Sequence, residues 1–117
     1  MSLFEELKSL GVNIDEGLGR INGNEKLYTR LLGTFVKSTE ANYITPDFDE
    51  SDLTSAIEKT HAIKGTSGNL SITPIYEEYS KIVDLLRKDD PKQAKSVLGD
   101  VLPVQEQIIA CIKKHMD

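Results

Sequence analysis

Apolar residues recur at intervals of three and four along almost the whole chain, and this spacing places them on one face of an α-helix. Glycine, asparagine and proline interrupt the pattern and divide it into segments joined by short connections. No segment shows the two-residue alternation of a half-buried strand, and the chain has no internal repeat. The pattern therefore predicts an all-α fold, namely an antiparallel four-helix bundle with one or more additional short N-terminal helices.

The N-terminal part should contain short helical segments followed by one long helix. Residues 2–10 form a short amphipathic segment, and Asn13 can cap the weak turn that follows it. Asn24 can cap the long helix, which carries two adjacent apolar rows and is expected to run to about Tyr43. Pro46 follows, and proline disfavours the helical conformation for the residue before it. The long helix should therefore end before this proline.

Three further helix starts are expected after this break. The first lies at Asp49 or Ser51. The dipeptides at 73–74 and 90–91 each combine a capping residue with a proline at the first helical position. Pro103 lies inside the last apolar segment, where it removes one backbone donor. We expect it to kink that helix or to divide the segment into two helices.

Composition excludes several classes of protein. A chain of 117 residues with 38% hydrophobic and 28% charged residues suits one domain, residues 1–117, with a modest core. The formal charge of −5 argues against nucleic acid or an anionic membrane as the partner. No apolar run approaches the roughly 18 residues that a membrane-spanning helix needs, and the N-terminus lacks the pattern of a signal peptide. We expect a cytoplasmic protein.

The residues that most often bind metals are few in this chain. Cys111 is the single cysteine, so a disulfide within the chain is impossible. It is expected to be a small core or boundary residue. His115 should cap carbonyls at the end of the last helix, and it is distant in sequence from His61, the other histidine. The sequence therefore predicts no metal site.

One helix carries an unusual combination of residues on a single face. His61, Lys64, Gly65 and Gly68 stand at i, i+3, i+4 and i+7, so they share that face. Each glycine inside a helix costs roughly 1 kcal/mol relative to alanine, so two of them beside one histidine are locally unfavourable. Local rules that are broken together indicate a functional surface. The alternative is a surface histidine on a helix whose glycines serve only packing.

The orientation of this face follows from the helical period. Ile63 belongs to the apolar row that should face the core, and His61 lies roughly 200° around the helix from it. His61 should therefore point to solvent, with Ile57 partly exposed one turn before it. An exposed imidazole is a candidate nucleophile. The glycines would let the backbone of a second protein approach it, and Lys64 would neutralise an incoming phosphoryl group.

These residues also carry a family resemblance. The stretch His61–Leu70, with the pattern His-x-x-Lys-Gly-x-Ser-Gly-Asn-Leu, resembles the active-site helix of histidine-containing phosphotransfer (HPt) domains. Residues 12–35 resemble the early helices of that family, so the likeness covers roughly two-thirds of the chain. It implies a phosphorelay intermediate that carries a phosphoryl group on His61 and has no kinase or ATP-binding site of its own. It also implies that Lys64 neutralises phosphate and that Ile57, Gly65 and Gly68 contact the partner.

The resemblance implies a specific class of partner. Response regulator receiver domains, which carry phosphate on aspartate, would exchange it with His61, and a hybrid histidine kinase is a further candidate. The receiver would supply Mg²⁺, so this chain should need no cofactor. We expect a monomer, because no apolar stripe remains free once the bundle core is filled. The sequence leaves open whether the domain belongs to a larger kinase, although its self-contained start and finish favour a single-domain protein.

Two positions depart from the family pattern. Ser71 stands where the family usually has glycine, and Val83 stands where it often has a glutamine or glutamate that hydrogen-bonds the histidine ring. Ser80 and Tyr76 are the candidates to support the ring instead. These departures leave a second hypothesis open, namely a non-catalytic adapter that has the same fold and binds receivers without transfer. Autonomous kinase activity is excluded as an interpretation, because the chain has no glycine-rich nucleotide loop.

Overall fold

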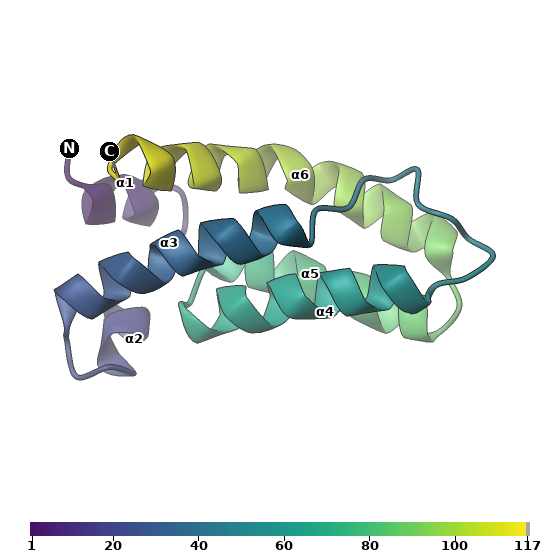
Figure 1. Ribbon diagram of the computed structural model, residues 1–117, viewed down its shortest axis with the longest axis horizontal. Coiled ribbons are helices and arrows are strands. Elements are labelled where there is room, and N and C mark those ends of the chain that lie inside the picture. Colours follow the sequence, from purple (N-terminus) through teal and green to yellow (C-terminus); the bar gives the residue numbers. More distant parts are fainter. Residues whose placement is uncertain (117) are drawn as a thin grey trace.

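The computed structural model describes residues 1–116, and this part of the chain forms six helices and no strand (Figure 1). The helices are α1 (Leu3–Ser9), α2 (Ile14–Gly19), α3 (Glu25–Ala41), α4 (Thr54–Asn69), α5 (Thr73–Arg87) and α6 (Pro91–Lys114). Helices α3 to α6 pack together as a bundle, and the short helices α1 and α2 lie at one end of it. The predicted all-α bundle with additional short N-terminal helices is confirmed.

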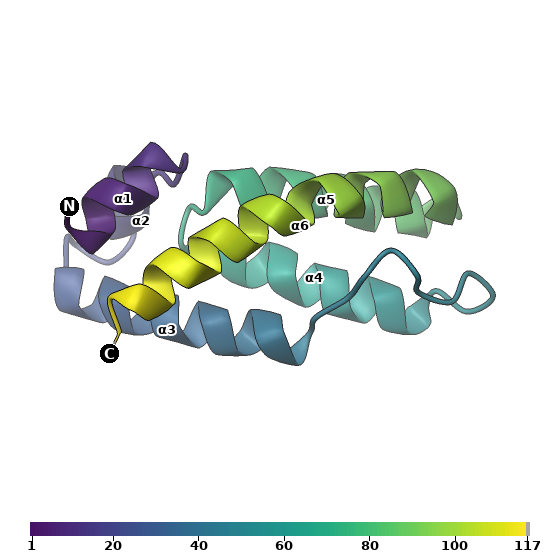
Figure 2. The same cartoon turned by 90° about the horizontal axis from the view of Figure 1, so that it is seen from above.

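Helix α5 is central to the packing, because it lies along both α4 and α6. Helix α3 contacts the same two helices, and α6 crosses it obliquely when the molecule is seen from above (Figure 2). Each packed helix contributes large apolar or aromatic side chains to one core, since the three-four spacing places them on one face. Fully buried examples are Leu7, Tyr28, Phe35, Ile63, Tyr79 and Leu98. No helix within residues 1–116 combines the length and the apolar character needed to span a membrane.

Side-chain caps start four of the helices. The side chains of Asn13, Asn24 and Asp90 each accept a hydrogen bond from the backbone N–H three residues later, at 3.1, 3.0 and 3.3 Å. Ser2 and Glu5 form a reciprocal capping box at the start of α1. Each cap satisfies an N–H that the helix itself leaves unpaired. The starts expected from Asn13, Asn24 and Asp90 are therefore confirmed.

The start of α4 differs from the expectation. The helix begins at Thr54 with Leu53 as the cap residue, and not at Asp49 or Ser51. The carboxylate of Asp49 accepts from the backbone N–H of Ser51 at 2.8 Å, which closes a local turn before the helix. Asp52 makes the same kind of bond to the N–H of Thr54, at 3.0 Å. These acidic side chains stabilise the connecting loop.

The structure departs from the expectation at Thr73 and rules out one of the two outcomes expected at Pro103. Thr73 is the first residue of α5 and not its cap, because Ile72 holds the cap position and Thr73 donates to the carbonyl of Ser71. Pro103 does not divide the last segment, because α6 continues through it from Pro91 to Lys114. Pro103 removes the backbone donor for the carbonyl of Gly99, four residues earlier. Both residues are exposed, so water can reach that carbonyl instead.

Gly17 allows α2 to pack closely against α3 and the end of α4. A Cβ atom at this position would lie 2.7 Å from Cε1 of Tyr28 and 2.8 Å from the carbonyl oxygen of Leu70. Tyr28 is fully buried, and its hydroxyl donates to the same carbonyl. Neither neighbour can move without disturbing the core.

We therefore expect Gly17→Ala to lower the free energy of unfolding by about 2 kcal/mol, as overpacking of a core does. Gly19→Ala is the matched control in the same helix, because a Cβ there would meet no atom within 4 Å. The control should be neutral or more stable by about 0.5 kcal/mol, since alanine favours helix over glycine. Urea denaturation of both variants measures the difference, and equal effects would contradict the proposed contact.

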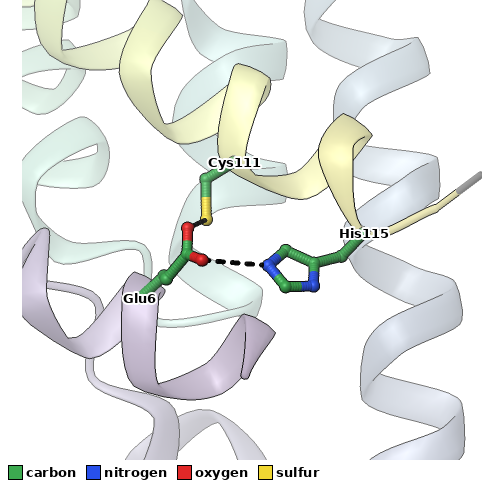
Figure 3. Close-up of side chains that lie close together, drawn as sticks. All are labelled: Glu6, Cys111 and His115. Atoms are coloured by element: carbon green, nitrogen blue, oxygen red, sulfur yellow. Dashed lines mark hydrogen bonds and ion pairs between the residues drawn. The ribbon is translucent and has the colours of Figure 1, made fainter. Parts of the chain in front are cut away.

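Glu6 connects α1 to the C-terminal end of α6 (Figure 3). Both of its carboxylate oxygens lie 2.9 Å from Nζ of Lys114, and Oε1 lies 3.2 Å from Nε2 of His115. The hydrogen bond from Lys114, followed by that from His115, lowers the pKa of Glu6 to about 2. The ionised carboxylate is therefore favoured in the folded protein.

This shift predicts a pH dependence of stability. Because the folded-state pKa lies below the ordinary value of 4.5, ionised Glu6 stabilises the fold at higher pH, and the stabilisation disappears as pH falls from 4.5 toward 2. Glu6→Gln should be less stable than wild type near neutral pH, and the difference should shrink through that window. Urea unfolding of both proteins at a series of pH values, with a metal chelator present, tests this. A difference that does not change with pH would contradict it.

Candidate functional site

Helix α4 presents one buried face and one exposed face. Ala56, Thr60, Ile63 and Ser67 are buried against the bundle, whereas His61 is exposed. The hydroxyls of Thr60 and Ser67 donate to backbone carbonyls one turn earlier in the helix, at 2.8 and 2.7 Å. These bonds let two polar residues occupy the apolar face without unpaired groups. Because this row packs against the bundle, His61 lies on the opposite, solvent-facing side of α4.

A surface concavity of about 600 Å³ borders the exposed face of α4. His61, Lys64, Gly65 and Gly68 line it from α4, and Tyr76 lines it from α5. The structure thus brings five of the seven candidate residues to one depression. The other two, Ile57 and Ser80, are partly buried and do not line it.

The two glycines beside His61 have different surroundings. A Cβ atom at Gly68 would lie 2.8 Å from both Cδ1 and Cε1 of Tyr76, so this glycine makes room for the tyrosine ring. At Gly65 a Cβ would meet no atom within 4 Å. Packing therefore explains Gly68, whereas Gly65 leaves bare backbone exposed beside His61. The packing alternative raised by the sequence accounts for one of the glycines and not for the other.

The positions considered for support of the histidine ring also differ in their burial and contacts. Val83 is fully buried, so it belongs to the core and faces away from the exposed side of the bundle. The hydroxyl of Ser80 donates to the backbone carbonyl of Tyr76 at 2.8 Å, one turn earlier in α5. Tyr76 is 40% exposed and borders the concavity together with His61. Of the two candidates, Tyr76 is the one that shares the surface of the histidine.

Ser71 ends α4 in a conformation that explains why glycine suits this position. Its φ of 56° lies in the left-handed region, and the N–H of Ile72 closes the helix end by donating to the carbonyl of Ser67 at 2.9 Å. The serine hydroxyl donates to the carboxylate of Glu16 at 2.6 Å and accepts from Arg20. The hydrogen bond from Ser71, followed by one that Arg20 donates directly to Glu16, lowers the pKa of the Glu16 carboxyl. The departure from glycine therefore ties the end of α4 to α2.

Sequence reasoning missed Arg20 and Glu16, which also line the concavity. Their spacing of four residues indicates an ion pair, and their side chains meet at 3.1 Å. Arg20 is therefore engaged by a carboxylate, whereas Lys64 forms no ion pair within residues 1–116. Lys64 is thus the cation at this surface that can accept an anionic group without first breaking a salt bridge.

Comparison of the chain with protein-family models, with curated proteins and with solved structures gives no match. A functional assignment therefore depends on the residues of the site and on their arrangement in the bundle.

Proposed function

We propose that this protein is a phosphorelay intermediate that carries a phosphoryl group on His61 and exchanges it with aspartate-containing receiver domains. The observation that carries the proposal is the surface around His61. It combines an exposed imidazole, open backbone at Gly65, and Lys64 one turn later, which forms no ion pair within residues 1–116. The resemblance of His61–Leu70 to the active-site helix of HPt domains supports the same conclusion.

The chemistry requires alignment and charge neutralisation. A neutral ring nitrogen of His61 attacks the phosphorus of the receiver's aspartyl phosphate, the N–P bond forms, and the P–O bond to the aspartate breaks to release its carboxylate. Lys64 would neutralise charge on the equatorial oxygens during transfer, and the receiver would supply Mg²⁺. Transfer back to a second receiver reverses these steps. The chain itself acts as a carrier and not as a kinase.

The shape of the surface suits a protein partner. Gly65 lets the backbone of a receiver come close enough for in-line attack, which requires the reacting atoms to lie about 3 Å apart. Tyr76 on α5 would add apolar contact within the concavity, and Ile57, partly exposed one turn before His61, would add it on the same helix outside the concavity. Gly68 contributes indirectly, because it positions Tyr76.

A non-catalytic adapter is the second candidate function. The burial of Val83 favours it, because the position that often orients the ring in the HPt family here belongs to the core. An adapter would bind receivers through the same surface without accepting phosphate. Binding alone therefore does not distinguish the two functions, whereas transfer does.

The test is phosphoryl transfer from a panel of labelled receiver domains to the full chain in the presence of Mg²⁺. We expect label that is labile in acid and stable in alkali, as a phosphohistidine is, and mass spectrometry should place it on His61. Incubation with labelled ATP alone should give no label. Receivers that bind the chain but never pass label to it would replace the carrier by the adapter.

A further inference from the structure

Three residues with metal-binding side chains converge where α1 meets the end of α6 (Figure 3). Cys111 lies in the last turns of α6, His115 caps that helix four residues later on the same side, and Glu6 faces both from α1. One ligand atom from each residue lies within 4.8 Å of the other two. This cluster contains no residue of the His61 site, and its chemistry is independent of the proposed phosphotransfer.

The separations are close to those that three ligands of one zinc ion require. Zinc bonds of about 2.0–2.1 Å to nitrogen and oxygen and about 2.3 Å to sulfur give edges of about 3.3–3.4 Å between N and O and about 3.5–3.6 Å between S and O. Nε2 of His115 lies 3.2 Å from Oε1 of Glu6, and Sγ of Cys111 lies 3.4 Å from Oε2. These two distances involve different oxygens of Glu6, and one ligand atom from each residue lies within 4.8 Å of the other two. Side-chain rotation would therefore have to bring the three ligand atoms to one centre.

We propose that Glu6, Cys111 and His115 bind one Zn²⁺ ion, with water in the fourth position. A thiolate, an imidazole and a carboxylate together favour zinc over the harder cations magnesium and calcium, which prefer oxygen ligands. The site opens to solvent, because the side chains of Glu6 and His115 are 21% and 24% exposed. An ion can therefore enter without unfolding the bundle, and a water molecule has access to it.

Binding would replace interactions that Glu6 makes in the metal-free protein. Lys114, which lies 2.9 Å from both carboxylate oxygens, would move to solvent, where its side chain is already 62% exposed. The Cys111 thiol would give up its proton to solvent as the Zn–S bond forms. The ion would then link α1 to the last turn of α6 more firmly than the ion pair does. Zinc should consequently stabilise the folded protein, because the unfolded chain does not hold the three ligands together.

Titration of the full chain with Co²⁺ and then Zn²⁺ under reducing conditions tests the proposal. We expect one Co²⁺ per chain, with the visible bands of a tetrahedral ion and a near-ultraviolet thiolate-to-cobalt band that Zn²⁺ removes. Cys111→Ser should abolish the thiolate band, and His115→Ala and Glu6→Gln should each weaken binding at least about tenfold. His61→Gln is the matched control and should bind as wild type does.

A thermal readout separates loss of a ligand from loss of folding. Zn²⁺ should raise the melting temperature of wild type and His61→Gln and leave that of Cys111→Ser unchanged, while circular dichroism without metal confirms that each variant folds. Absence of a thiolate band in wild type would overturn the site. So would unchanged affinity in the Cys111 and His115 variants, or loss of binding in His61→Gln.

Discussion

His61→Gln should receive no phosphoryl group from any receiver domain that labels the wild-type chain. Glutamine has a similar reach, but its amide nitrogen is not a nucleophile at neutral pH, so no N–P bond can form. The substitution lies on the exposed side of α4 and removes no core contact. Its effect on the free energy of unfolding should therefore stay within about 0.5 kcal/mol. The expected result is complete loss of transfer in a folded protein.

The measurement is transfer of label from a phosphorylated receiver over time, followed for wild type, His61→Gln and His115→Gln. The last variant is the matched control, because His115 is the other histidine of the chain and lies beside Glu6 at the end of α6. It should accept label at the wild-type rate. Receiver affinity should be similar for all three proteins. Label retained by His61→Gln would show that the phosphoryl group is carried elsewhere.

The fold could be predicted from the sequence because most of its causes are local. Asn13, Asn24 and Asp90 cap helices through bonds to the residue three positions later, which the sequence displays directly. The periodic apolar positions then identify the faces that must meet. Helix α4 was one exception, since Asp49 and Asp52 have the chemistry of caps but stabilise turns in the loop before it. A capping residue alone does not show which of several successive turns becomes a helix.

The candidate site could be predicted only in part. Helical spacing is enough to place His61, Lys64, Gly65 and Gly68 on one face of α4. It cannot distinguish Gly65 from Gly68, because the difference depends on where the ring of Tyr76 on α5 lies. The relative positions of two helices must therefore be known before a glycine can be classed as exposed backbone or as space that a neighbouring side chain fills.

Interactions between residues distant in the sequence account for what was missed. Ser71 lies 55 residues from Glu16, and Glu6 lies 105 and 109 residues from Cys111 and His115. No periodic pattern connects such positions, so a single sequence does not reveal the network at the end of α4. For the same reason the sequence did not show that Cys111 and His115 both lie beside Glu6. The relevant neighbour, Glu6, comes from a helix that docks only in the folded chain.

The open backbone at Gly65 leads to the second prediction with a large effect. Gly65→Leu should reduce the rate of transfer from a receiver at least about 100-fold, because a side chain beside His61 holds the receiver too far away for in-line attack. The same substitution should stabilise α4 by about 0.5 kcal/mol, since a Cβ at this position meets no atom within 4 Å and leucine favours helix over glycine. Activity and stability should therefore change in opposite directions.

Gly33→Leu is the matched control for this experiment. Gly33 lies inside α3, a Cβ there also meets no atom of residues 1–116 within 4 Å, and the residue does not line the concavity around His61. It should gain similar stability and keep the wild-type rate of transfer. Receiver affinity and transfer kinetics of both variants, together with urea denaturation, separate a blocked surface from an altered fold. If Gly65→Leu binds and accepts phosphate as Gly33→Leu does, receivers do not dock over this face, and the proposed geometry fails even if His61 carries the phosphate.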